Sequence, residues 1–142
     1  MTEEVSIRIK GSSSGDDTEI ISEARGSYHL HKGRHYVTFD EEDTVSGTVI
    51  KNNITIDEIR MHHSKLGETE TSLCFEKEKE HETQYRTPYG SFTLMTKTNS
   101  YEVITEEESI RVYIDYELIL NGQSSGNRII EMEIGGIKDN EY

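Results

Sequence analysis

Strict alternation of apolar and polar residues recurs along this chain from Val5 almost to Ile134, and it constrains the fold more than any other feature. A repeat of two places successive side chains on opposite faces of a strand, whereas an amphipathic helix needs apolar residues three and four positions apart. No window of ten or more residues has the helical spacing. The pattern predicts about ten strands and no substantial helix.

The residue types agree with this pattern. Sixteen Ile, six Val and fourteen Thr stand against one Ala and six Leu. β-branched side chains fit a pleated sheet, whereas Ala and Leu are leading helix formers. The composition therefore favours strands as well.

Turn residues divide the alternating segments from one another. The clearest predicted strands cover residues 5–10, 18–24, 28–31, 34–39, 69–77, 83–86, 92–98 and 109–120. A bend is expected near Asn99, and the Glu/Lys run 76–82 is interpreted as a solvated extension or loop. Residues 135–142 have no pattern, so we predict a single domain over 1–134 followed by a flexible tail.

The hairpin at Lys32-Gly33 allows a test of register, because directly opposed residues share a face of the sheet. A two-residue loop there pairs Tyr28 with Val37 and Leu30 with His35. One face of the hairpin then becomes apolar and the other polar, which supports this pairing.

Asn52-Asn53 is interpreted in the same way, as an Asn-rich turn that places Val49 opposite Ile56. After Ile56 the apolar residues change parity, which predicts a β-bulge near Asp57 or Glu58.

The longest strand, 109–120, is predicted to pair with the segment that ends at Ile134. With Asn121–Asn127 as the loop, Tyr116 falls opposite Met132, and the neighbouring pairs are Leu118 with Ile130 and Ile114 with Ile134. The apolar face is then continuous.

Antiparallel strands that each have one apolar face must bury it by closing a barrel or by stacking two sheets. We favour an all-β, closed antiparallel up-and-down barrel of about eight to ten strands over two stacked sheets. The chain contains, in this order, a Gly-Ser turn at 11–15, the turn Thr87–Gly90 before Phe92–Thr98, and the strand Ile110–Leu118. This order of elements resembles that of the bacterial YwiB-like family of uncharacterised proteins. This resemblance implies a barrel similar to the calycin group, which includes the lipocalins, and an expectation of small-ligand binding. It implies no catalytic residues.

The formal charge of −13 argues against a nucleic-acid partner and against an anionic membrane surface. No apolar run reaches the length of about 18 residues that a membrane-spanning helix needs, and the N-terminal sequence does not resemble a signal peptide. Cys74 is the only cysteine and lies in a strand pattern, so we expect it to pack or to lie at the surface. A cytoplasmic location is expected.

Histidines are the most conspicuous candidates for a metal site. His29 and His31 project to one face of the predicted hairpin, whereas His35 projects to the other, so the three do not converge. His62 and His63 are adjacent and point to opposite faces, and His81 lies in the charge run. We therefore expect no metal site and no cofactor.

Carboxylates are abundant, but the runs 41–43, 76–82 and 106–108 fall at expected turns or edges. General acid-base chemistry needs a carboxylate in a shielded cleft with a shifted pKa, and no feature places one there. Asp115 lies on the clearest strand but shares its polar face. We expect no catalytic residue and predict that the protein is not an enzyme.

A closed barrel of this size can leave a cavity for one small molecule. Polar residues on the apolar faces would line it, and the candidates are Tyr85, Arg86, Tyr89, Thr96, Thr98 and Tyr116. The alternative is that Tyr116 and the two threonines are ordinary core and strand residues. On the outer face, Tyr36, Tyr113 and Ile119, which is expected opposite Ile129, suggest a protein-interaction surface and a possible homodimer.

The leading functional hypothesis is therefore non-enzymatic binding of a small, partly apolar ligand in the barrel interior. A protein-interaction or dimerising module with a packed core is the alternative.

Overall fold

The computed structural model describes residues 1–13 and 18–137. The described residues form ten strands, which are β1 (Glu4–Ser13), β2 (Glu19–His31), β3 (Arg34–Glu42), β4 (Val49–Ile56), β5 (Arg60–Leu66), β6 (Glu70–Glu76), β7 (Glu80–Thr87), β8 (Gly90–Thr105), β9 (Ser109–Leu120) and β10 (Gln123–Gly136). No helix of the described segments is long and apolar enough to cross a membrane.

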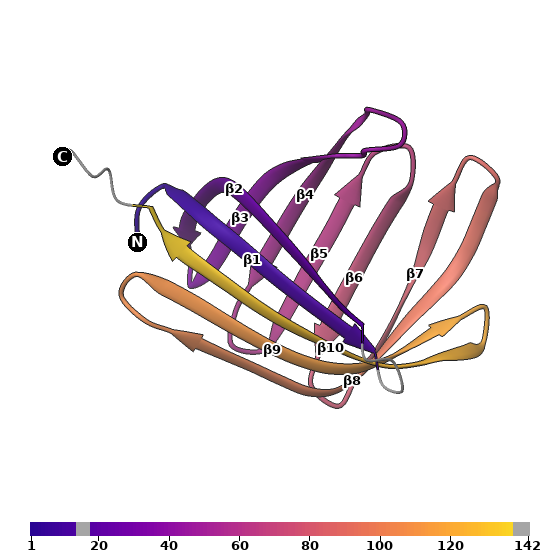
Figure 1. Cartoon of the computed structure of the whole chain (residues 1–142). Helices are drawn as coiled ribbons and strands as arrows, with labels where there is room; N and C mark the ends of the chain where they lie inside the picture. The colour runs from indigo at the N-terminus through magenta and orange to yellow at the C-terminus, as the bar shows by residue number, and fades with distance from the viewer. Residues whose placement is uncertain (14–17, 138–142) are drawn as a thin grey trace.

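The ten strands close into one barrel (Figure 1). Each strand is antiparallel to the strand before it in the sequence, and β1 also pairs with β10, as in Val5 opposite Gly136 and Ile7 opposite Ile134. This confirms the predicted all-β, closed antiparallel up-and-down barrel. The alternative of two stacked sheets is wrong.

Three layers of apolar side chains fill one half of the interior. Across β1, β10, β9 and β8, the registers align Ile9, Met132, Val112 and Val103 in one such layer. The fully buried side chains of the core are Val5, Val37, Ile54, Ile56, Met61, Phe75, Ile110, Ile114 and Ile134, with Ile7 almost as deeply buried. These side chains belong to one contiguous core cluster.

The Lys32-Gly33 hairpin has the predicted register, with Tyr28 opposite Val37 and Leu30 opposite His35. The segments 18–24 and 28–31 form one continuous strand, β2, because Gly26 does not interrupt it. A Cβ at Gly26 would overlap the carbonyl oxygen of Thr38 and lie 2.9 Å from Cβ of Phe39. Gly26 thus permits a close approach between neighbouring strands.

The predicted turn at Asn52-Asn53 is wrong, because both residues lie inside β4. Val49 pairs with Glu42 of β3 and is not opposite Ile56. The side chain of Asn52 is buried and fully hydrogen-bonded, which offsets the usual cost of an amide in a strand.

The predicted bulge near Asp57 or Glu58 is also wrong, because the chain reverses there and joins β4 to β5. The carboxylate of Asp57 accepts hydrogen bonds from the backbone N–H groups of Ile59 and Arg60, at 2.8 and 2.9 Å. This side-chain turn, and not an inserted residue, changes the parity.

The connection between β9 and β10 is shorter than predicted. Asn121 and Gly122 have φ values of 48° and 80°, the left-handed pair that a two-residue hairpin turn requires. The pairing predicted for Tyr116 is wrong, because Tyr116 lies opposite Arg128, while Ile114 lies opposite Ile130. A bulge between Ser124 and Asn127 restores the parity, so the predicted faces remain correct.

Three other regions define the rest of the wall. The bend near Asn99 is present as a register shift between Thr98 and Ser100. The charge run 76–82 contributes to β6 and β7, and Glu76 is buried beside Arg60, Lys79 and His81 instead of being solvated. β10 extends to Gly136, and residues 138–142 of the predicted tail lie outside the described residues.

Candidate functional site

Four polar residues on neighbouring strands lie in register on the inner face of the barrel. Ser13 of β1 is opposite Arg128 of β10, Arg128 is opposite Tyr116 of β9, and Tyr116 is opposite Thr98 of β8. We call Ser13, Arg128, Tyr116 and Thr98 the polar row. It follows the three apolar layers, on the side of the Asn121-Gly122 turn.

Local strand structure brings these side chains together. Arg128 alternates with Ile130 and Met132, whose side chains point inward, so it shares their face. The register shift at Asn99 lets both Thr98 and Tyr101 face the interior although they are three residues apart.

Two buried atoms of the polar row have no hydrogen-bond partner among the described residues. They are Oγ1 of Thr98, whose residue is only 1% exposed, and Nε of Arg128. Buried polar atoms are nearly always satisfied in native proteins, so each exception needs a reason. Both exceptions here flank Tyr116.

Tyr116 itself is held by apolar contact. Its ring packs edge to face against Phe75 of β6, with 4.8 Å between the ring centroids. Burial raises the pKa of Tyr116, and the nearby guanidinium of Arg128 partly offsets this increase. The phenol is therefore neutral at physiological pH and available as a hydrogen-bond donor beside a cation.

A second polar group lies on strands β3, β4 and β5, and we call Glu41, Asn52, His63 and Lys65 the histidine network. His63 donates from Nε2 to Oδ1 of Asn52 at 2.8 Å, and Asn52 donates from Nδ2 to Oε1 of Glu41 at 2.9 Å. Lys65 lies 3.2 Å from the same Glu41 oxygen. These groups satisfy one another, so the network needs no ligand.

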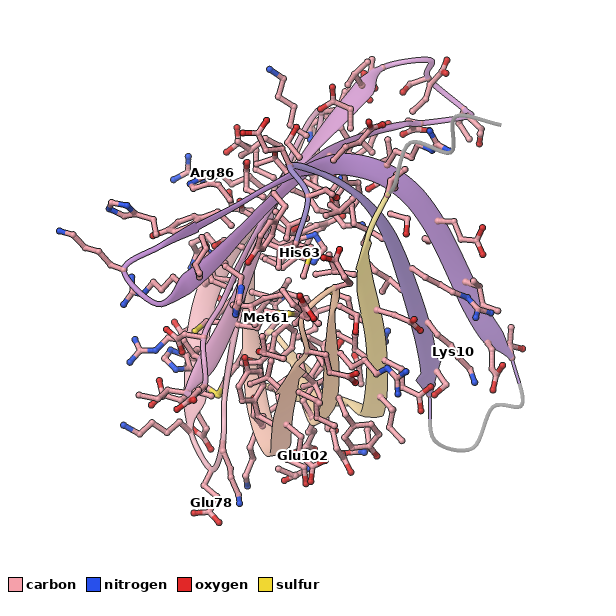
Figure 2. The ribbon with its side chains drawn as sticks, turned by 90° about the vertical axis from the view of Figure 1, so that its left-hand side faces the viewer. Lys10, Met61, His63, Glu78, Arg86 and Glu102 are labelled. Atoms are coloured by element: carbon pink, nitrogen blue, oxygen red, sulfur yellow. The ribbon has the colours of Figure 1, made fainter. Side chains whose placement is uncertain are left out.

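Burial lowers the pKa of His63 to about 4, and the nearby Lys65 acts in the same direction. Burial by itself would raise the pKa of Glu41, but the hydrogen bond from Asn52 and the charge of Lys65 bring that pKa below its usual value. A neutral imidazole and an ionised carboxylate thus coexist near neutral pH. Figure 2 shows His63 and Met61 between the walls of the barrel.

Apolar side chains remain exposed on the inner face near the polar row. Ile20 lies opposite Gly11 and is 69% exposed, and Leu120 and Phe92 are partly exposed near the ends of β9 and β8. Apolar surface beside a few polar groups is the composition typical of small-molecule sites.

The six predicted ligand residues separate into two groups. Thr96, Thr98 and Tyr116 are buried in the interior, and Tyr85 is half-buried with its ring beside that of Phe92. Arg86 of β7 is exposed, and Tyr89 in the β7–β8 turn is 96% exposed. Thr96 is already engaged, because its hydroxyl donates to the backbone carbonyl of Cys74 at 2.5 Å.

Sequence reasoning missed Arg128 and did not select His63. Arg128 could have been found from its parity with Ile130, Met132 and Ile134, which places it on the apolar face. His63 could not be distinguished from His62, because two adjacent histidines on a strand give no indication of which one points inward.

The remaining predicted candidates are arranged as follows. His29 stacks on Tyr36, whereas His35 is hydrogen-bonded to the Tyr28 hydroxyl at 2.8 Å on the other face. Within residues 1–13 and 18–137, no group of three or more His, Cys, Asp or Glu side chains is arranged to hold a metal ion. Cys74 is half-buried, and burial raises its pKa, which disfavours the reactive thiolate.

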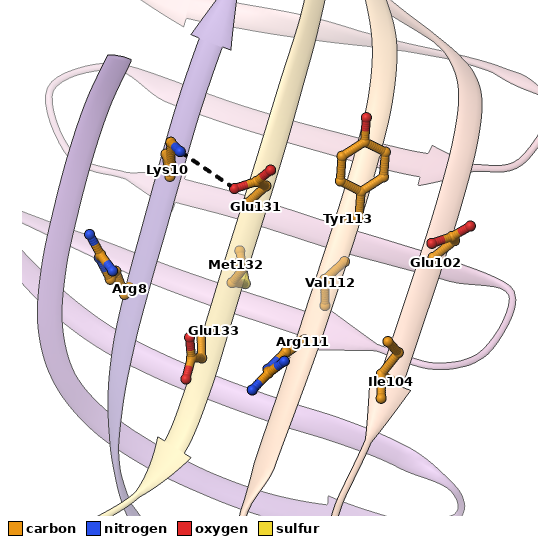
Figure 3. A pocket seen from close by; sticks show the side chains of 10 residues that line it. All are labelled: Arg8, Lys10, Glu102, Ile104, Arg111, Val112, Tyr113, Glu131, Met132 and Glu133. Carbon is orange, nitrogen blue, oxygen red and sulfur yellow. Dashed lines mark ion pairs between the residues drawn. The ribbon is translucent and has the colours of Figure 1, made fainter.

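A shallow hollow of about 320 Å³ lies on the outer surface of β1, β10, β9 and β8 (Figure 3). Charged side chains surround an apolar floor, and Lys10 and Glu131 form an ion pair across part of it at 3.7 Å. Tyr113, predicted as an interaction residue, lies here beside Glu131 and not beside an apolar partner. The predicted pair of Ile119 and Ile129 is wrong, because Ile119 lies opposite Ser124 and Ile129 opposite Asp115.

Residues 5–132 match the family model described as a domain of unknown function, DUF1934. The chain belongs to this family. The DUF1934 match includes all residues of the polar row and of the histidine network. No protein with a curated description matches the chain.

A solved structure has a similar fold, the crystal structure of the ywiB protein from Bacillus subtilis. It aligns over 95% of this chain and 91% of its own, with a TM-score of 0.77 and 18% sequence identity. This similarity agrees with the expected relationship to YwiB-like proteins and with a calycin-like barrel. At this identity it supports the fold of the DUF1934 chain and does not indicate a ligand.

Proposed function

We propose that this protein is a non-enzymatic binding barrel that holds one small, partly apolar molecule beside the polar row. The observation that carries the proposal is the pair of buried, unpartnered polar atoms, Oγ1 of Thr98 and Nε of Arg128, on either side of Tyr116. A bound molecule that supplies hydrogen-bond partners would remove the energetic cost of both.

The packing restricts where this molecule lies. The three apolar layers belong to one buried core cluster, so we place the proposed site in the half of the interior near Thr98 and Tyr116 and not in the centre of the barrel. Exposed Ile20 and Leu120 provide apolar surface for the remainder of the ligand. The combination of a few polar groups with apolar walls is typical of small-molecule sites.

A protein-interaction module remains the second candidate because the outer hollow contains the exposed Ile104 and the half-buried Tyr113 beside its charged rim. The hollow is shallow, and its open charges are solvated. None of the residues that line it has a buried polar atom without a hydrogen-bond partner, so we rank it second.

The two candidates differ in which tyrosine of β9 matters. Tyr116 faces the interior, and Tyr113 faces the outer hollow. Binding of a neutral, environment-sensitive dye, Nile red, would be measured by fluorescence titration for the unmodified protein, Tyr116→Ala and Tyr113→Ala. We expect saturable binding by the unmodified protein, a loss of at least tenfold in affinity for Tyr116→Ala, and little change for Tyr113→Ala.

Circular dichroism and thermal melting establish that each variant is folded. If Tyr116→Ala does not fold, Thr98→Val tests the same site with a substitution of nearly equal volume. Absence of saturable binding, or loss of binding only in Tyr113→Ala, overturns the interior site.

A further inference from the structure

The polar row contains the one arginine whose side chain faces the inside of the barrel. Four arginines on the outside form ion pairs, which are Arg8 with Glu23, Arg25 with Glu4, Arg34 with Asp57 and Arg60 with Glu76. Arg86 and Arg111 have no carboxylate partner among the described residues, but both are exposed to water. Arg128 also has none in the described part of the chain, and its Nε is buried.

Among the arginines of the described residues, Arg128 alone combines a buried Nε with the lack of a carboxylate partner. Acidic residues outnumber basic ones by 28 to 15, so the chain has more than enough carboxylates to pair with each cation. Placing a partly buried guanidinium where no carboxylate reaches it costs free energy unless an anion compensates. The fixed donor geometry of arginine suits the oxygens of a carboxylate or a phosphate.

The neighbours of Arg128 complete a set of hydrogen-bond donors. Tyr116 directly opposite carries a neutral phenol, and Thr98 beyond it has a free hydroxyl. Ile130 and Ile114 form the adjacent layer, so the surroundings of these donors are apolar. Resting on the proposed binding function, we infer that the ligand is an amphipathic organic acid whose carboxylate is held by Arg128, Tyr116 and Thr98.

The arrangement favours a single negative charge over a dianion. One guanidinium faces the site, and the formal charge of −13 on the whole chain repels a second negative charge. An alkyl phosphate would therefore bind less well than an alkyl carboxylate of equal length.

The test uses three probes that share one chain length, namely decanoate, decanol and decyl phosphate. Competition with Nile red would be measured near neutral pH for the unmodified protein, Arg128→Gln and Arg111→Gln. Arg111 is the matched control because it is an unpaired arginine on the neighbouring strand that faces outward. The unmodified protein should bind decanoate at least tenfold more tightly than either decanol or decyl phosphate.

In Arg128→Gln, decanoate should lose at least tenfold in affinity while decanol changes less than threefold. Arg111→Gln should leave both affinities unchanged. Equal affinity for decanoate and decanol, a preference for decyl phosphate, or an equal loss in the two arginine variants overturns the carboxylate assignment. None of these outcomes contradicts the binding function itself, which fails when Nile red shows no saturable binding or loses binding only in Tyr113→Ala.

Thermal melting gives an independent measurement in case Arg128→Gln binds nothing. An arginine retained for a ligand is not needed for folding, so without ligand Arg128→Met should melt at the same temperature as the unmodified protein or higher. Decanoate should raise the melting temperature of the unmodified protein and not that of Arg128→Met. A variant that melts well below the unmodified protein assigns Arg128 a structural role and overturns the inference.

Discussion

His63 donates a hydrogen bond from Nε2 to Oδ1 of Asn52, 2.8 Å away, inside the barrel wall. The carboxylate of Glu41 accepts the amide hydrogen of Asn52, which fixes the orientation of that amide and hence the protonated nitrogen of His63. Two interior residues of the sheet thereby determine a tautomer that would otherwise be free to vary.

The first prediction concerns acid stability. Because burial lowers the folded-state pKa of His63 from 6.5 to about 4, the unfolded chain binds a proton between these values that the folded chain does not. The neutral His63 therefore contributes to stability fully above pH 6.5, and this contribution is lost as the pH falls toward 4. Between pH 7 and pH 5 the free energy of unfolding should fall by about 2 kcal/mol for this reason. Urea unfolding at both pH values should show a smaller loss in His63→Gln, which keeps a hydrogen-bond donor but cannot titrate.

His62→Gln provides the control, because His62 is exposed on the opposite face of the same strand and bonds to Ser72. Its loss of stability between the two pH values should equal that of the unmodified protein. Equal losses in all three proteins would contradict a neutral His63 in the folded state.

The second prediction compares two threonines that are equally buried but differently bonded. Thr98→Val removes an unsatisfied hydroxyl, so the free energy of unfolding should stay constant or rise by about 1 kcal/mol. Thr96→Val leaves the carbonyl of Cys74 without its hydrogen and should lower the free energy of unfolding by about 1 to 3 kcal/mol. Chemical denaturation without ligand would measure the free energy of unfolding of both variants. A larger loss in Thr98→Val than in Thr96→Val would refute the assignment of the free hydroxyl to Thr98.

The third prediction concerns two glycines in strands. Gly26→Ala should lower the free energy of unfolding by about 1 to 3 kcal/mol, because the new methyl group overlaps the Thr38 carbonyl and Phe39. Gly11→Ala, where a Cβ would meet nothing within 4 Å, should be neutral or slightly stabilising. Thermal melting distinguishes them, and similar melting temperatures would show that β2 and β3 separate more easily than their packing indicates.

The sequence predicted the barrel and the face of the sheet on which most side chains lie. Alternation of apolar and polar residues identifies these faces even where the position of a turn is predicted wrongly. The Lys32-Gly33 register was correct because apolar residues alternate on both strands. Asn52 was misassigned because an asparagine in a strand resembles a turn until its buried partners are known. Those partners, Glu41 and His63, are distant in the sequence.

The error at the β9–β10 turn explains why the candidate site was only partly predicted. A seven-residue loop in place of the Asn121-Gly122 turn kept the parity but placed Met132 opposite Tyr116. Arg128 was thereby separated from Tyr116, and an interior cation beside a phenol was not recognised. Thr98 and Tyr116 were found because alternation alone reveals a polar residue on an apolar face.

The boundary between β6 and β7 differs from the other nine. In the described chain, Glu70 and Arg86 are its only register pair, whereas β5 and β6 have seven. The carbonyl of Cys74 instead accepts its bond from a side chain of β8. Backbone amides along this boundary are expected to exchange with solvent sooner than those elsewhere in the wall, because local opening there breaks few cross-strand bonds. Such an opening would separate β6 from β7 and leave the β5–β6 and β7–β8 hairpins intact. A molecule in solution would then reach Tyr116 through the side of the barrel without global unfolding.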